Sequence, residues 1–132
     1  MSLREKIMEE TQGLKGTIGI AVKHLQTGEE AFVEGDTSFP TASVFKLPLL
    51  VELYRQVEEG HISLDQKLEM AEKVKVPGSG IIRELSSGLE MTVRDYVTLM
   101  MLLSDNTATD MLLELVGTEN VDRNLRRLGF EK

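Results

Sequence analysis

The 132-residue sequence contains no cysteine, no tryptophan and only two histidines. Without cysteine, neither disulfide bonds nor thiolate metal ligands are available. The two histidines, His24 and His61, are far apart and form no H-x-H type pair, so the sequence disfavours a catalytic zinc site. We therefore expect neither a metal ion nor any other cofactor.

Long apolar runs and excess positive charge are also missing. No apolar run approaches the roughly 18 residues that a membrane-spanning helix needs. The formal net charge is −7, which argues against a nucleic-acid partner because phosphate backbones repel acidic proteins. The start, residues 1–6, has no apolar core and no small-residue cleavage site, so we do not expect a secretory signal peptide.

One stretch, residues 39–54, combines a short polar entry with a long apolar segment. From Val44 to Tyr54 almost every residue is apolar, and the apolar positions cover all sides of a helical projection. This pattern predicts a central helix that is buried on all faces. Ser43 and Lys46 lie three positions apart at its start, which places their side chains on one face of the first turn.

The pair formed by Ser43 and Lys46 suits nucleophilic catalysis. A serine hydroxyl is a poor nucleophile until a base removes its proton, and a lysine serves as that base when desolvation lowers its pKa. A helix N-terminus would also place unpaired backbone N–H groups beside Ser43, where an oxyanion develops during acyl transfer. Taken alone, the spacing is a weak signal and favours a helix cap and a solvated lysine.

A second motif, Ser104-Asp105-Asn106, separates two apolar runs. Asp and Asn are common at junctions between helices, so a structural role as a cap is one interpretation. In the chemical interpretation, Ser104 relays a proton between Lys46 and a leaving nitrogen. Asn106 then contacts both the lysine and an amide of the substrate. Both interpretations are compatible with each other.

Together the two motifs resemble those of class A β-lactamases, within the wider family of penicillin-recognising serine enzymes, for which S-x-x-K and S-D-N are signatures. The motifs begin at residues 43 and 104, a spacing close to that of class A. The flanking residues 39–46, 91–95 and 104–108 resemble the family as well, and the resemblance extends from about residue 16 to 129. It implies Ser43 as nucleophile, Lys46 as its base, Ser104 as a proton relay and Asn106 as a positioning and substrate-binding residue.

The sequence departs from the family after Asn106. No Lys-Thr-Gly triplet follows, and neither does a Glu-Pro-Glu-like loop that would bring the deacylating glutamate. We therefore expect residues 1–132 to form a single partial domain, the N-terminal half of a β-lactamase-like domain, with the later strands absent. A partner would be a complementing C-terminal half, or a second copy joined through an unpaired sheet edge.

The expected fold class is α+β. A capping box at Ser2 predicts a first helix ending near Gly13 or Gly16, and alternation over residues 17–25 and 30–34 predicts a β-hairpin. A further helix is expected from Thr92, and its buried stripe includes Leu103. Two more helices are expected, from about 107 to 116 and from 119 to 128. The helices would form a cluster around the buried central helix, resembling part of the β-lactamase/transpeptidase-like fold.

Three functions are compatible with these residues. The resemblance favours a serine β-lactamase-type hydrolase that forms an acyl-enzyme on Ser43 with a β-lactam, truncated and weakly active or inactive alone. A D-alanyl-D-alanine peptidase-like acyl-transferase would use the same serine, lysine and second serine. A non-catalytic half-domain that needs a complementing chain is the third. Family members are usually exported, so the absence of a leader leaves the localisation open.

Overall fold

The computed structural model describes residues 2–130 and divides into two compact units, one up to Thr41 and one from Ala42 onward. We call them the N-terminal unit and the helical unit. Residues 1, 131 and 132 lie outside the described residues. The single partial domain predicted for residues 1–132 stays a prediction.

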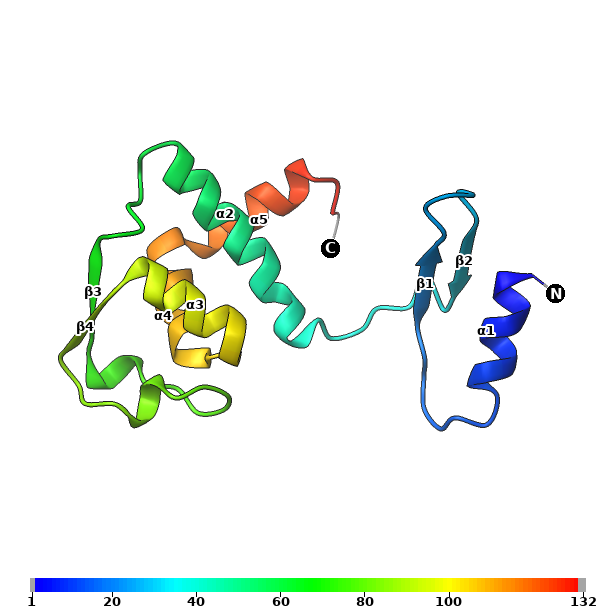
Figure 1. The fold of residues 1–132 in the computed structure, drawn as a ribbon, viewed down its shortest axis with the longest axis horizontal. Helices are drawn as coiled ribbons and strands as arrows, with labels where there is room; N and C mark the ends of the chain where they lie inside the picture. Colours follow the sequence, from blue (N-terminus) through cyan, green and yellow to red (C-terminus); the bar gives the residue numbers. More distant parts are fainter. Residues whose placement is uncertain (1, 131–132) are drawn as a thin grey trace. The chain divides into compact units, whose positions relative to one another are not determined.

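The N-terminal unit consists of one helix and one β-hairpin (Figure 1). Helix α1, Leu3–Thr11, starts with the expected capping box, in which Ser2 and Glu5 exchange hydrogen bonds. Strands β1, Ile20–Lys23, and β2, Glu30–Val33, pair antiparallel with Ala21 opposite Phe32. The predicted helix and hairpin are therefore confirmed, and within this sheet each strand has one edge without a strand partner among the described residues.

The helical unit is built around α2, Lys46–Glu58, which packs against α4 and α5 (Figure 1). Helices α3, Val93–Leu103, and α4, Asn106–Val116, follow each other and also pack together. Helix α5, Thr118–Arg127, closes the described part of the chain. The α+β class and the central helix are thus confirmed, with boundaries close to those expected.

A second hairpin, which the sequence did not predict as such, lies beside the helices. Strands β3, Lys67–Met70, and β4, Leu89–Thr92, pair antiparallel. Between them come two short 3₁₀ helices, η2, Glu72–Val74, and η3, Ile82–Glu84. Thr92 ends β4 and caps α3, the helix expected from this residue, through a second capping box with Asp95.

The core of the helical unit is apolar and is centred on one side of α2. Leu49 and Leu53 of α2 are fully buried, together with Tyr96 of α3 and Leu112 of α4. The opposite side of α2 is exposed, so the prediction of burial on all faces is wrong for the described structure. Leu103, expected in the buried stripe of α3, is also exposed, because α3 ends there and the chain turns into α4.

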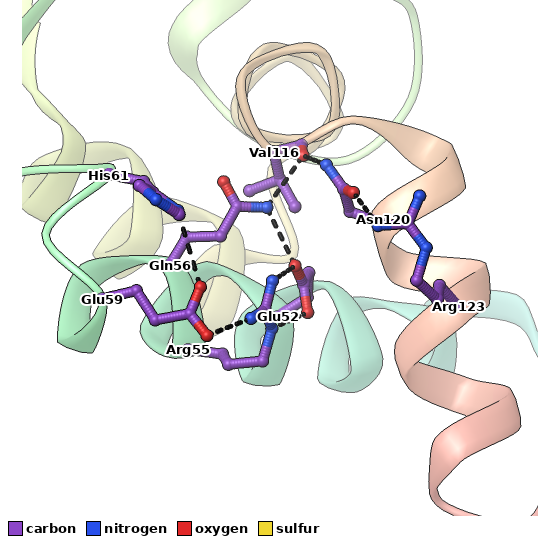
Figure 2. Close-up of polar contacts among 8 residues, drawn as sticks. All are labelled: Glu52, Arg55, Gln56, Glu59, His61, Val116, Asn120 and Arg123. Carbon is purple, nitrogen blue, oxygen red and sulfur yellow. Dashed lines mark hydrogen bonds and ion pairs between the residues drawn. The ribbon is translucent and has the colours of Figure 1, made fainter.

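A buried polar network joins the C-terminal half of α2 to the end of α4 (Figure 2). The fully buried Glu52 carboxylate accepts two hydrogen bonds of 2.7 Å from Arg55 and one of 2.9 Å from Gln56. Gln56 also donates to the Val116 carbonyl, which accepts a second hydrogen bond from Asn120. The hydrogen bonds from Arg55 hold the pKa of Glu52 below its ordinary value, despite its burial. The network thus pins the ends of two helices through a paired charge.

Candidate active site

The four residues singled out by the two motifs come from the start of α2 and from the junction between α3 and α4. Ser43 belongs to a short 3₁₀ helix, η1, Ala42–Phe45, and Lys46 is the first residue of α2. Pro48 lies in the first turn of α2, where a missing N–H costs no helical hydrogen bond. Ser104 is the C-cap of α3, and Asn106 is the first residue of α4.

Their side chains form one connected cluster. The Oγ atoms of Ser43 and Ser104 lie 2.9 Å apart, although the residues are 61 positions apart in the chain. The Nζ atom of Lys46 donates to the Oγ atom of Ser104 at 2.8 Å and to its carbonyl oxygen at 2.7 Å. A third donation, of 3.2 Å, goes to Oδ1 of Asn106. The structure therefore brings all four residues together.

The connection from Ser43 to Lys46 runs through Ser104. Within residues 2–130, no direct hydrogen bond joins the Ser43 hydroxyl to the Lys46 amine. Because an ammonium group has three protons, the three hydrogen bonds of Lys46 use all of its donors. Taking up a proton from Ser104 requires a neutral amine, whose lone pair would accept the hydrogen bond that the ammonium now donates.

The surroundings of Lys46 favour its neutral form. Its side chain is buried, with 3% of its surface exposed, whereas Ser43 beside it is exposed. Burial lowers the pKa of Lys46, because desolvation penalises the ammonium form. The carboxylates of Asp105 and Asp110 act in the opposite direction and raise it. The cluster thus places a buried amine behind an accessible hydroxyl.

Two residues of the site have backbone conformations that are uncommon for side chains other than glycine. Ala42, directly before Ser43, has φ of 44°, and Ser104 has φ of 53°. Positive φ costs energy for residues with a Cβ atom and is often found at functional sites. The left-handed conformation of Ser104 ends α3 and turns the chain, so that its hydroxyl and its carbonyl oxygen both contact Lys46.

Asp105 has, besides its role as a helix cap, contacts that the sequence did not indicate. Its carboxylate is buried, caps α4 through the Ala108 N–H at 2.9 Å, and accepts hydrogen bonds from the N–H groups of Ile81 and Ile82 at 2.7 and 2.9 Å. It therefore ties the loop before η3 to the junction that carries Ser104 and Asn106. The sequence indicated only its role as a cap, because its loop partners are more than 20 positions away.

The loop around residues 77–80 approaches this junction closely, and two glycines allow it to do so. Gly78 and Gly80 have φ of 112° and 111°, and a Cβ atom on either would lie 2.3 Å or less from Asn106 or Asp105. The Asn106 amide group donates to the Pro77 carbonyl at 3.2 Å, and the Asn106 N–H donates to the Ser79 carbonyl at 2.9 Å. These contacts fix the orientation of Asn106, so that Oδ1 faces Lys46.

Metal and membrane sites receive no support from the part of the chain that the structure describes. No group of three or more His, Cys, Asp or Glu side chains is arranged to hold a metal ion among residues 2–130. In the same range, every helix is too short or too polar to cross a bilayer. His61 lies at the C-terminal end of α2, 3.5 Å from Glu59, and belongs to the surroundings of the polar network in Figure 2.

Solved structures share this arrangement of helices and strands. The β-lactamase from Sphaerobacter thermophilus matches with a TM-score of 0.87 and 35% identity, over 95% of this chain and 47% of its own length. An ancestral class A β-lactamase matches with a TM-score of 0.86 and 31% identity, over 98% and 50%. A mutant of PBP-A, solved as an acyl-enzyme complex with penicillin G, matches with a TM-score of 0.88 and 27% identity, over 98% and 50%. The fold is that of the N-terminal part of a β-lactamase.

Sequence comparisons agree with the structural ones. A family model described as the beta-lactamase enzyme family matches residues 2–132. The β-lactamase regulatory protein BlaB of Streptomyces cacaoi is 33% identical over 119 residues, which cover 89% of this chain and 38% of that protein. The chain therefore belongs to the β-lactamase enzyme family, as the two motifs predicted. It spans less than half the length of this curated relative and about half of the solved chains.

Proposed function

We propose that this chain carries the acylating part of a serine β-lactamase-type site. The Oγ atom of Ser43 attacks the carbonyl carbon of a β-lactam amide, the new C–O bond forms, and the C–N bond of the ring breaks. The proton that Ser43 loses passes through the Ser104 hydroxyl to Lys46, and Ser104 returns a proton to the ring nitrogen. The observation that supports this path is the series of contacts from Ser43 to Ser104 to Lys46, of 2.9 and 2.8 Å.

Each remaining residue has a defined part in the proposal. Burial favours the neutral amine of Lys46 that this path needs, and general bases of this kind contribute about 10²- to 10⁴-fold in rate. Asn106 contacts Lys46 through Oδ1 and would also contact the amide of a bound substrate. Ser43 is exposed, so a substrate reaches it without displacing a side chain. No cofactor takes part in these steps.

We further propose that the acyl-enzyme persists on these 132 residues instead of turning over. Deacylation needs a base that activates water on the acyl carbonyl, and the sequence offers neither a Glu-Pro-Glu-like loop nor a Lys-Thr-Gly triplet after Asn106. The chain spans about half of the solved β-lactamase chains it matches, which agrees with a site whose hydrolytic groups come from elsewhere.

Intact-mass spectrometry after incubation with penicillin G tests the proposal. The parent protein should gain the mass of one penicillin, and the Ser43→Ala variant should gain none. Lys46→Met and Ser104→Ala should form the adduct about 10²-fold more slowly or worse, since each breaks the proton path. A folded parent that shows no adduct at saturating penicillin G would refute an acylating site in the isolated chain.

Two other functions are each favoured by one comparison. PBP-A, which matches over 98% of this chain, favours a D-alanyl-D-alanine peptidase-like acyl-transferase. Release of D-alanine from a D-alanyl-D-alanine peptide, abolished by Ser43→Ala, would identify it. BlaB is described as a regulatory protein, which favours a non-catalytic domain. That function predicts a folded protein without adduct or release in either assay.

A further inference from the structure

A small cavity lies between α2 and α5, next to the polar network of Figure 2. Its volume is about 90 Å³, whereas pockets for drug-sized ligands measure about 300–1,000 Å³. Figure 2 shows two of its residues on α2 and two on α5. Both helices belong to the helical unit, so the cavity is formed within one compact unit. It is lined by three arginines, two asparagines and one glutamate: Arg55, Arg123, Arg127, Asn120, Asn124 and Glu52.

Two of the three arginines carry a charge that no carboxylate pairs. Glu52 is the only acidic residue in the lining, and Arg55 already donates two hydrogen bonds to it. Glu59, outside the lining, also pairs with Arg55. Arg123 donates to a neutral amide oxygen at 3.0 Å, and neither Arg123 nor Arg127 forms an ion pair in the part of the chain that the structure describes. The lining therefore carries an excess of positive charge.

The two unpaired arginines lie on one face of α5. Arg123 and Arg127 are four positions apart, and so are Asn120 and Asn124, which places each pair at neighbouring positions on the helix surface. Like charges at this spacing repel each other. An anion held between the two guanidinium groups would remove that repulsion. The planar fork of donors on each group also matches the oxygens of a carboxylate or a phosphate.

The side chain of Asn124 points to a ligand independently of these charges. Asn124 is only 9% exposed, and its amide group has no hydrogen-bond partner among residues 2–130. Within the same range, no fully enclosed side-chain polar atom lacks a partner, because such an atom would cost the desolvation free energy of its group. The Asn124 amide therefore opens into the spaces that it lines, which are this cavity and the groove beside it. It can donate two hydrogen bonds there.

We propose that this cavity binds a small oxyanion, either phosphate or the carboxylate group of a larger molecule. Arg123 and Arg127 would supply the positive charge, and the amide of Asn124 would donate to an oxygen of the ligand. Glu52 stays paired with Arg55, so its charge does not exclude the ligand. The cavity adjoins the C-terminal half of α2, whereas Ser43 precedes the other end of that helix. The site is therefore separate from the acylating site.

Isothermal titration calorimetry of the 132-residue protein with inorganic phosphate, and separately with acetate, tests the site. The titrations are done at constant ionic strength, because salt screens exposed charges. We expect saturable one-to-one binding. In Arg127→Gln the affinity should fall by about 10-fold or more, which is the effect of losing a charge-assisted hydrogen bond. Arg127 is exposed, so this variant should fold like the parent.

The matched control is Arg126→Gln. Arg126 adjoins Arg127 in the last turn of α5, so both variants remove the same charge at the same helix end. Arg126 is outside the lining of the cavity and lines a separate hollow with Glu119 and Asp122. The affinity of this variant should stay within about twofold of the parent, because a charge without contact to the ligand is screened by salt.

A carboxylate fixed inside the cavity gives a second test that needs no added ligand. Asn124→Asp keeps the size of the side chain and places a negative charge beside Arg123 and Arg127. A cavity suited to an anion should make this variant more stable than the parent, and phosphate should no longer stabilise it. Thermal unfolding measures both effects, since a ligand that binds the folded state raises the melting temperature. Phosphate also stabilises proteins by exclusion from their surface, so Arg127→Gln provides the baseline.

Three outcomes would overturn the inference. The first is a folded parent that shows no saturable binding of either phosphate or acetate. The second is an equal affinity of Arg126→Gln and Arg127→Gln, which would mean that the anion responds only to the net charge of the protein. The third is a lower stability of Asn124→Asp than of the parent, which would mean that the cavity does not accept an anion.

The two titrations distinguish the sources of the oxyanion. Tighter binding of phosphate would identify a tetrahedral ion as the ligand, and tighter binding of acetate would identify a carboxylate group. Either result supports the site, provided that Arg127→Gln weakens the binding and Arg126→Gln does not. Because these measurements do not involve Ser43, a failure of the acylation test leaves them unaffected.

Discussion

Replacing Gly80 by alanine tests whether the loop before η3 holds the active-site junction in place. A Cβ atom at residue 80 would lie 2.2 Å from Cγ of Asp105 and 2.6 Å from its Cα atom. The backbone neighbour cannot move away as a flexible side chain would, so either the loop or the start of α4 must shift. The hydrogen bonds from Ile81 and Ile82 to Asp105 would then lengthen or break.

The expected cost is the sum of two effects. A residue with a Cβ atom at positive φ costs about 1–2 kcal/mol relative to glycine, and forced overpacking costs about 1–3 kcal/mol more. Gly60→Ala separates the two, because Gly60 also has positive φ, 77°, and nothing lies within 4 Å of the position that a Cβ atom would take there. We therefore expect Gly80→Ala to be less stable than Gly60→Ala by about 2 kcal/mol.

Urea unfolding followed by tyrosine fluorescence measures this difference. Tryptophan is absent and the two tyrosines, Tyr54 and Tyr96, belong to α2 and α3, so the signal reports the helical unit. With a slope of about 2 kcal/mol per molar urea, the midpoint of Gly80→Ala should lie about 1 M below that of Gly60→Ala. Equal midpoints for the two variants would refute the close packing of the loop on Asp105.

Three further predictions concern charges and buried polar groups. Asp110→Asn removes a carboxylate that raises the pKa of Lys46, so the pH at which penicillin acylation is half-maximal should move to lower values. A stopped-flow pH profile measures this midpoint, and an unchanged or higher midpoint would contradict the prediction. Gln56→Leu removes two buried hydrogen bonds, those to Glu52 and to the Val116 carbonyl, although both acceptors keep another donor. At about 0.5–1.5 kcal/mol for each hydrogen bond, the variant should lose about 1–3 kcal/mol in urea unfolding. A neutral effect would mean that the network in Figure 2 does not pin the helices. The pKa of Glu52 is lowered from 4.5 in the folded protein, so its ionised form stabilises the fold above pH 4.5, and this contribution is lost as the pH falls through the lowered pKa. The difference in stability between the parent and Glu52→Gln should therefore shrink on acidification. Urea midpoints measured from pH 6 downward would show this decrease.

Local signals in the sequence predicted the elements whose stabilising partners are close in the chain. Ser2 and Glu5, like Thr92 and Asp95, are three positions apart, and both pairs form capping boxes at helix starts that the sequence predicted. The hairpin of β1 and β2 was predicted for the same reason, since only a short turn separates its strands. The β3–β4 pairing was not predicted, because a loop with two 3₁₀ helices lies between these strands.

The candidate site was predictable as a set of residues, but its connections were not. The motifs named Ser43, Lys46, Ser104 and Asn106, and the structure brings them together. Ser104 lies between Ser43 and Lys46 because its backbone is left-handed, and no local pattern in the sequence predicts that conformation. The exposure of one side of α2 was also unpredictable, since the sequence of a helix that is apolar all round does not show which side packs on the core.

The position of Ser104 restricts which residues could take its place. Because φ at this position is 53°, a β-branched side chain would be strained here, so threonine, although it keeps a hydroxyl, is no conservative replacement. Glycine would adopt the same backbone without strain and would still present the carbonyl oxygen to Lys46, while removing the hydroxyl alone. Backbone geometry as well as chemistry therefore restricts sequence variation at residue 104. A Ser104→Gly variant separates these two constraints experimentally, because it keeps the backbone conformation and removes the hydroxyl.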